Sequence, residues 1–434
     1  MNSINKNFRV MGFDTADILI PKKDVNLNKW AVVACDQFTS EKGYWEDVSD
    51  YVGKAPSTLN LIFPECYLED KDGDRRIAEI NRKMDEYFSS ELFDTYKDCF
   101  FLVKRTCGKN SRLGLMVALD LERYSWEKDS KSLIRATEST ILSRIPPRKK
   151  IRKDAPLEIP HIMVLISDSE KSVIEPLYSK NSKLEKAYDT ELMMNGGHLE
   201  AWVVDSEEDK LAVQKAFEKI NASLDSSNPL LFAMGDGNHS FATAKSCWED
   251  IKETLSPEER ENHPARFCLV ELENIFDEGL VFEPINRVFF NVPESVFIDE
   301  LKKTADGIEF EEVNCKNCIA KRIDDQSVQG FGYCTSEKHV YVKIKNPKSN
   351  ISAGTIQKVI DSLIEKGYSV DYIHGNDVTD KLGSEKGNIG IFMPAIDKKV
   401  FFETILKDGA LPRKTFSMGE ANEKRYYMEC RKIR

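Results

Sequence analysis

No apolar run in the 434-residue sequence approaches the roughly 20 residues that are needed to cross a bilayer. The polar start, residues 1–7, lacks the apolar core of a signal peptide. There is also no low-complexity tract and no internal repeat, and the charged residues (31%) are spread along the whole length. We therefore expect an ordered, cytoplasmic protein with no membrane partner.

An excess of positive charge is missing as well. Lys and Arg number 62 against 73 Asp and Glu, which gives a formal net charge of −11. This balance would repel a polyphosphate backbone and disfavours nucleic acid as a partner. Small anions remain possible ligands, because a few backbone N–H groups and one or two cations can override the net charge locally. The expected partner is a small-molecule substrate, and the oligomeric state is left open.

The ten cysteines are scattered and do not form a disulfide framework. One close pair occurs, Cys315 and Cys318. A tetrahedral zinc site would need two further ligands, and the sequence offers no second Cys pair and no His pair at ligand spacing. We therefore interpret the two cysteines as ordinary thiols.

The length predicts two or three domains, and strands that alternate with helices predict a mixed α/β to α+β fold in a multi-layer globule. We expect an N-terminal α/β region over residues 1–155 and a central α/β region over 156–305. An α+β region over 306–434 is expected to follow.

The central region contains the most informative segment. Five apolar residues, 230–234, predict a strand that ends at Gly235, Asp236 and Gly237. Two glycines so close together permit backbone conformations that other residues avoid. Apolar residues then recur at helical spacing from 241 to 251. With His239 or Ser240 as the N-cap, the N–H groups of residues 241–243 would point into a cleft and form an anion site.

The side chains of this turn have several possible roles. Asp236 could bind the Mg²⁺ ion carried by a phosphate or act as a base, and His239 could bind a phosphoryl oxygen or shuttle a proton. The alternative is an Asx-turn carboxylate and a capping imidazole without a ligand. The combination of strand, glycines, acid, amide and imidazole favours the functional interpretation. The predicted phosphate-binding residues of the turn are Gly235, Gly237, Asn238 and Ser240.

The turn resembles the Asp-Gly-His-His-Arg type of loop of the ParB/sulfiredoxin superfamily, which holds nucleotide phosphates. The whole chain is identified as a member of the bacterial domain-of-unknown-function family 1015. The similar segments are residues 134–140, 160–166, 235–240, 282–287 and 371–375. The resemblance implies a ParB/sulfiredoxin-like core with additional α+β regions.

This sequence departs from the superfamily pattern at two positions. Asn238 replaces the first His and Ser240 replaces the Arg, so the phosphate-binding guanidinium is missing from the loop. Another cation must therefore take its place. Arg135, Arg266 and Arg287 are candidates, although each arginine taken alone is more typical of a surface salt bridge.

Further polar residues extend the predicted site. Residues 133–142 are expected to be helical, which would place Arg135 and Glu138 on one face as substrate-binding and catalytic groups or as an i,i+3 ion pair. Residues 144–156 are expected to be a loop because of their prolines and charges.

Three more residues are expected to contact the substrate or phosphate, and two histidines are expected to lie outside the site. Glu283 and Arg287 are expected at a cleft edge, and His374 follows a predicted strand. His161 and His198 have no partner at ligand spacing, and we interpret them as structural.

Two functions of different classes are expected. The first is a small-molecule phosphotransferase or phosphohydrolase that uses Mg²⁺ and ATP or ADP. Its resemblance to free-serine kinases implies serine or phosphoserine as the substrate. The alternative is a non-catalytic nucleotide- or metabolite-binding regulator of the ParB-like type.

Overall fold

The computed structural model describes residues 3–127, 129–325 and 327–434. Contacts divide the chain into two compact units, unit 1 (Met1–Val281 with Gly419–Arg434) and unit 2 (Phe282–Met418). The three regions expected from the sequence do not match this division. Strands from both sides of residue 155 pair in one sheet, and so do strands from both sides of residue 305.

Unit 1 is built on one large mixed sheet. Its main strand order is β5-β6-β11-β8-β12-β4-β3-β10-β9, while β1 pairs with β4 and β2 with β3. The strands are β1 (Phe13–Asp14), β2 (Ala16–Pro21), β3 (Phe93–Cys107), β4 (Asn110–Asp120), β5 (Tyr124–Ser125), β6 (Ile134–Arg135), β8 (Met163–Ile166), β9 (Lys186–Leu192), β10 (Gly197–Val204), β11 (Phe232–Asp236) and β12 (Phe267–Asn274). A separate pair joins β7 (Leu157–Glu158) to β20 (Arg431–Lys432).

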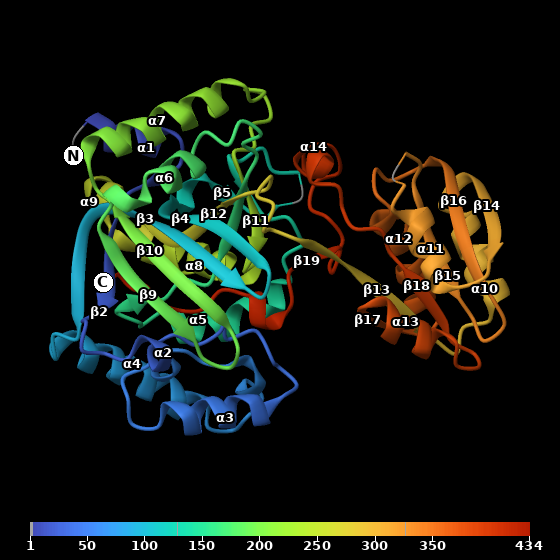
Figure 1. Cartoon of the computed structure of the whole chain (residues 1–434), viewed down its shortest axis with the longest axis horizontal. Coiled ribbons are helices and arrows are strands. Elements are labelled where there is room, and N and C mark those ends of the chain that lie inside the picture. The colour runs from blue at the N-terminus through green and yellow to red at the C-terminus, as the bar shows by residue number, and fades with distance from the viewer. Residues whose placement is uncertain (1–2, 128, 326) are drawn as a thin grey trace. The chain divides into compact units, whose positions relative to one another are not determined.

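Helices cover both faces of this sheet (Figure 1). They are α1 (Ser3–Val10), α2 (Leu27–Trp30), α3 (Lys42–Val52), α4 (Gly73–Ser89), α5 (Ile145–Arg152), α6 (Glu175–Ser179), α7 (Glu207–Ala222), α8 (Asn238–Lys252) and α9 (Pro257–Asn262). Successive side chains of a strand point to opposite faces. Phe101 therefore joins a core with residues of α3 and α4, whereas Phe100 joins a second core with residues of α1, α7 and α8.

Two local expectations are wrong. Residues 133–142 do not form a helix, because Ile134 and Arg135 form β6 and pair in parallel with both β5 and β11. The expected loop at 144–156 contains α5. Its two prolines occupy the first turn, where a missing backbone N–H removes no helical hydrogen bond.

Unit 2 is an α+β structure with its own sheet, of order β14-β16-β15-β18-β13-β17, to which β19 is added beside β13. Its strands are β13 (Phe282–Phe290), β14 (Ala305–Val313), β15 (Gly330–Cys334), β16 (His339–Pro347), β17 (Ser369–His374), β18 (Ile389–Phe392) and β19 (Phe416–Met418). Its helices are α10 (Glu294–Lys302), α11 (Lys316–Ile323), α12 (Ser352–Glu365), α13 (Asn376–Gly383) and α14 (Lys398–Asp408). Together the two units confirm the expected mixed α/β to α+β fold class.

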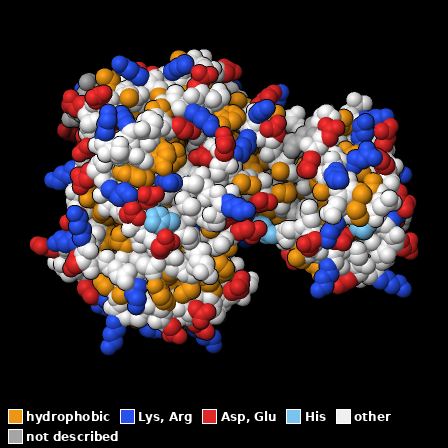
Figure 2. All heavy atoms as spheres, viewed as in Figure 1, with side chains coloured by type: hydrophobic (Ala, Val, Ile, Leu, Met, Phe, Trp, Pro, Cys, Tyr) orange, Lys and Arg blue, Asp and Glu red, His pale blue; other side chains and the backbone are white. Residues whose placement is uncertain are grey.

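The surface carries charges of both signs. On the face shown in Figure 2, Lys and Arg side chains are interspersed with Asp and Glu over each unit. None of the helices in the described ranges is both long and apolar enough to cross a membrane.

Candidate phosphate-binding site

The predicted strand, turn and helix are present in unit 1 as β11, Gly237 and α8. The pairing of β11 with β8 shifts register between Met234 and Asp236, so Gly235 is the extra residue of a bulge. Gly237 has φ +80°, and a Cβ there would lie 2.9 Å from Cγ1 of Ile162. The turn thus requires glycine at position 237 for both conformation and space.

The helix begins two or three residues earlier than predicted. Gly237, not His239 or Ser240, is the N-cap, and the N–H of Phe241 donates to the Gly237 carbonyl at 3.0 Å. The first-turn N–H groups without an intrahelical acceptor are therefore those of residues 238–240 rather than 241–243. These N–H groups lie at the positive end of the helix dipole, which favours an anion there.

Lys424 is a cation at this turn. Its Nζ lies 3.2 Å from Oδ2 of Asp236, and its side chain is 9% exposed. Burial opposes ionisation of Asp236, but the charges of Lys424 and His161 and the hydrogen bonds from Lys424 and the Gly237 N–H more than offset it. The pKa of Asp236 consequently lies below its usual value of 3.8.

Lys424 was not among the cations considered from the sequence. Lys424 is far from Asp236 in the sequence, so no local pattern links the two residues. It reaches the turn because the segment 419–434 belongs to unit 1. Neighbouring buried ion pairs hold that segment in place. Arg425 binds Glu271 at 2.6 Å, and Arg431 binds Glu158 at 2.6 Å.

The arginines proposed for this role have other partners. Arg135 donates to the carbonyls of Ser132 and Pro229, so it supports the backbone around them. Arg266 makes a two-point contact with Asp120.

The segment that contains Glu138 lies against the turn. The Thr137 N–H donates to Oδ1 of Asn238 at 3.0 Å, and the Thr137 hydroxyl donates to the Met234 carbonyl at 2.6 Å. The Ile141 N–H donates to Nε2 of His239 at 3.2 Å. Glu138 therefore lies between two residues that are hydrogen-bonded to the turn, and its side chain is half-buried.

These contacts limit what two predicted residues can do. The Asn238 side chain binds Thr137, so Asn238 can contribute its backbone N–H to an anion. Nε2 of His239 accepts a hydrogen bond, which places the proton of the neutral ring on Nδ1. His239 cannot take a proton at Nε2 while that bond lasts.

His161, which the sequence analysis interpreted as structural, contacts the last residue of the predicted turn. Its Nε2 lies 3.0 Å from Oγ of Ser240, and its Nδ1 lies 3.2 Å from the hydroxyl of Tyr427. The Tyr427 hydroxyl also accepts from the N–H of Cys35 at 3.1 Å. Burial raises the pKa of Tyr427 well above its ordinary value, so its hydroxyl keeps its proton.

A cavity of about 140 Å³ opens beside Ser240 and His161. It is smaller than the roughly 300–1,000 Å³ typical of pockets for drug-sized ligands. Its wall includes Glu65 and Arg148, which form an ion pair. Burial raises the pKa of Glu65, and Arg148 opposes that change. The cavity thus offers both signs of charge and room for a compact molecule.

Three predicted residues lie in unit 2 and are described there alone. Arg287 is fully buried and donates to the carbonyls of Ile285 and Lys414, so it is part of the core of unit 2. Glu283 is half-buried in β13, where it pairs with Ser417 in the register. His374 ends β17 and is exposed.

The turn fits a phosphate better than a resident Mg²⁺ ion. Oδ1 of Asp236 accepts from the Gly237 N–H at 2.9 Å, and Oδ2 is paired with Lys424. Magnesium favours several oxygen ligands in octahedral geometry, whereas this carboxylate already has two donors. A metal at Asp236 would have to displace Lys424.

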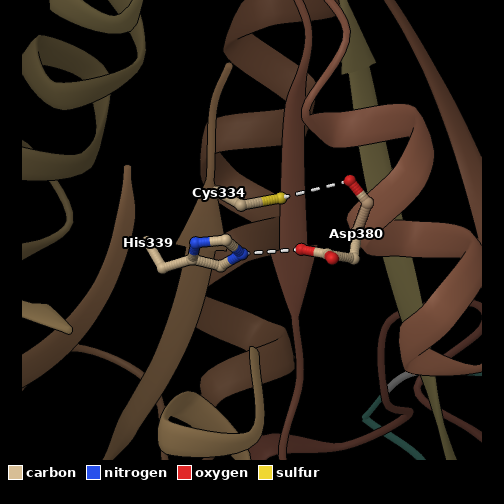
Figure 3. A group of neighbouring side chains, drawn as sticks. All are labelled: Cys334, His339 and Asp380. Atoms are coloured by element: carbon tan, nitrogen blue, oxygen red, sulfur yellow. Dashed lines mark hydrogen bonds and ion pairs between the residues drawn. The ribbon is translucent and has the colours of Figure 1, made fainter. Parts of the chain in front are cut away.

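Two other groups in the described ranges bring metal-ligating atoms within 4.8 Å of one another. One is Asp189, His198 and Glu200, on the surface of unit 1. The other is Cys334, His339 and Asp380 in unit 2, where His339 and Asp380 bind each other at 2.6 Å (Figure 3).

Comparison with solved structures gives matches of low similarity. A conserved hypothetical protein from Pyrococcus furiosus is 12% identical, with a TM-score of 0.34, over 72% of this chain and 90% of that chain. A free serine kinase variant in complex with AMP is 10% identical, with a TM-score of 0.39, over 74% and 91%. A further complex of that kinase contains ADP, at 10% identity and a TM-score of 0.38, over 76% and 94%.

Sequence comparisons give the family. Among curated proteins the search finds no match. The model of a family described as a protein of unknown function, DUF1015, matches residues 19–363, which confirms the family expected from the sequence. The chain therefore belongs to the DUF1015 family.

Proposed function

We propose that unit 1 is a cytoplasmic phosphotransferase that binds a nucleotide phosphate at the start of α8 and transfers it to the hydroxyl group of a small metabolite. The observation that carries this proposal is the position of Lys424 beside the first turn of α8. Three backbone N–H groups and one ammonium group together supply the positive charge that a phosphate requires.

The acceptor that we propose is amino-acid-like, with free serine as the first candidate. The paired charges of Glu65 and Arg148 can bind the ammonium and carboxylate groups of such a molecule. The cavity beside Ser240 suits its size. The donor that we propose is ATP or ADP, which would arrive with its own Mg²⁺ ion.

Transfer needs a base for the hydroxyl proton of the acceptor. Glu138 is the proposed base, because its neighbours Thr137 and Ile141 are bonded to Asn238 and His239. In the forward reaction the bond between the transferred phosphorus and the nucleotide oxygen breaks and a bond to the acceptor oxygen forms. The proton passes to the Glu138 carboxylate, and Lys424 and the N–H groups balance the charge on the phosphoryl oxygens.

The test is an assay of the full-length protein with Mg²⁺ and ATP or ADP in the presence of serine, and separately with phosphoserine. We expect phosphoserine from the first mixture, and serine and ATP from phosphoserine and ADP in the second. Lys424→Met and Glu138→Gln should each reduce kcat/KM by about 10²-fold or more. Lys432→Met is the matched control, because Lys432 lies in the same segment but is exposed.

Other outcomes reject parts of the proposal. Turnover that is unchanged in Asp236→Ala would exclude a role for the pair of Asp236 and Lys424. Tight binding of ADP without turnover of any hydroxylated amino acid would favour the alternative, a nucleotide- or metabolite-binding regulator.

A further inference from the structure

Unit 2 contains a pair of cysteines whose arrangement the sequence alone did not reveal. Cys315 is the N-cap of α11 and Cys318 lies in its first turn. Their Sγ atoms are 3.1 Å apart, and both side chains are half-buried and free. A thiol pair so close at the surface can form a disulfide with little movement of the backbone.

The surroundings of the two sulfur atoms differ. The Cys318 thiol and the N–H groups of Cys318 and Asn317 stabilise a thiolate on Cys315, and Lys321 adds a positive charge, so the pKa of Cys315 lies below its usual value of 9.0. The pKa of Cys318 is raised by its hydrogen bond to Cys315. Cys315 is therefore the better nucleophile, and Cys318 is placed to react second.

The third thiol of unit 2 does not compete for this role. Cys334 is fully buried, and burial raises its pKa to about 11. It donates weakly to the backbone carbonyl of Asp380, as Figure 3 shows. Neither Cys315 nor Cys318 belongs to a metal-capable group within the described part of the chain.

Contacts between α11 and α13 fix the helix start that carries the pair. Lys316 binds Asp377 at 2.5 Å and lies 3.9 Å from Asp380. Asp380 in turn holds His339 at 2.6 Å (Figure 3). Because Lys316 stands between the two cysteines, these contacts hold their backbone in the geometry that brings the sulfurs together.

We propose that Cys315 and Cys318 form a dithiol site that exchanges with disulfides, with small disulfides such as oxidised glutathione as its substrate class. The Cys315 thiolate attacks one sulfur of the disulfide, which forms a mixed disulfide and releases one thiolate. The Cys318 thiol then loses its proton and attacks the Cys315 sulfur, which releases the second thiol. In total two cysteine thiols are oxidised to one disulfide and one external disulfide is reduced to two thiols.

The first experiment incubates the full-length protein with oxidised glutathione and identifies the products by mass spectrometry of the peptides. The wild type should form a disulfide between Cys315 and Cys318. Cys318→Ser should stop at a mixed disulfide of glutathione with Cys315, because the second attack is removed. Cys315→Ser should react more slowly, since the better nucleophile is missing.

Cys107→Ser is the matched control, because Cys107 is a half-buried free thiol in unit 1. It should behave as the wild type does. Alkylation with iodoacetamide at neutral pH gives a second measurement, and Cys315 should react about 10-fold faster than Cys107. Circular dichroism of each variant checks that unit 2 remains folded.

Two results would overturn the proposal. One is a wild-type protein in which both cysteines stay reduced in excess oxidised glutathione. The other is a Cys318→Ser variant that shows no mixed disulfide and alkylates at the rate of Cys107. Neither result bears on the site in unit 1, so the two proposals succeed or fail separately.

Discussion

Replacing Lys424 with methionine tests the central feature of the site. Lys424 is the ammonium partner of Asp236, and methionine has a similar length without the charge. The variant should be less stable and should bind phosphate or ADP more weakly. The loss of stability comes from leaving the Asp236 carboxylate unpaired, whereas the loss of binding comes from the missing Lys424 charge. A second change at Asp236 can therefore separate the two effects.

The expected loss of stability follows from the burial of the pair. Removing one partner of a fully buried ion pair costs about 3–5 kcal/mol. The Asp236 side chain is 24% exposed and keeps its bond from the Gly237 N–H, so we expect about 1–2 kcal/mol. This corresponds to a fall in Tm of about 2–8 °C. The lost charge-assisted hydrogen bond should weaken anion binding by about 10- to 100-fold.

The effect on stability should depend on pH in a defined direction. The folded-state pKa of Asp236 is below 3.8, so the ion pair stabilises the fold above that pH and is lost as pH falls through the folded pKa. The difference between wild type and Lys424→Met should therefore be largest near neutral pH. It should shrink as the pH falls through the folded-state pKa of Asp236, where the wild type also loses the ion pair.

The assay combines urea unfolding over a range of pH with calorimetric titration of ADP. Asp236→Asn in the Lys424→Met background should restore stability, because no carboxylate is left unpaired, but it should not restore binding. A Lys424→Met variant with wild-type stability and wild-type affinity for ADP would refute the assignment of Lys424 to the site.

Three further substitutions, the first with a matched control, test other parts of the fold. Gly237→Ala should cost about 2–4 kcal/mol, because φ is +80° and the new Cβ lies 2.9 Å from a neighbouring side chain. Gly108→Ala, with φ +57° and open space, should cost only about 1 kcal/mol, and equal losses in urea unfolding would contradict this reasoning. Glu300→Gln should destabilise unit 2 above pH 4.5, because three hydrogen bonds lower the pKa of Glu300 to about 2. In an acid titration followed by circular dichroism, the difference in stability from the wild type should vanish as the pH falls through that pKa. Glu158→Gln should cost about 3–5 kcal/mol in urea unfolding, since it leaves the buried Arg431 without its anion, and a loss below that of an exposed glutamate would be inconsistent with a buried pair.

The local part of the site could be predicted from sequence. The apolar run, the two glycines and the helical period correctly located β11, the turn and α8. The N-cap was misplaced by two or three residues because Gly237 takes the cap position in a left-handed conformation. Capping preferences favour side chains such as Ser, so a glycine cap is easily overlooked.

Nonlocal pairing explains the wrong helix at 133–142. Apolar residues at Leu133, Ile134 and Ile141 permit helical spacing, and the polar residues between them do not exclude it. The segment becomes a strand because β11 and β5 offer hydrogen bonds on both of its sides. Propensity is a weak guide where such pairing is available.

Lys424 and His161 could not be found by spacing, because each reaches the turn through contacts of residues far away in the chain. The position of Lys424 depends on buried charges: Arg425 and Arg431 bind carboxylates of β12 and β7, and Lys424 directly precedes Arg425. The segment that carries Lys424 is thus the same segment that closes the core of unit 1. A change that loosens these arginines should move Lys424 away from Asp236 and weaken anion binding before it unfolds the unit. Measuring ADP affinity and stability together in such variants would separate the position of the cation from the integrity of the fold.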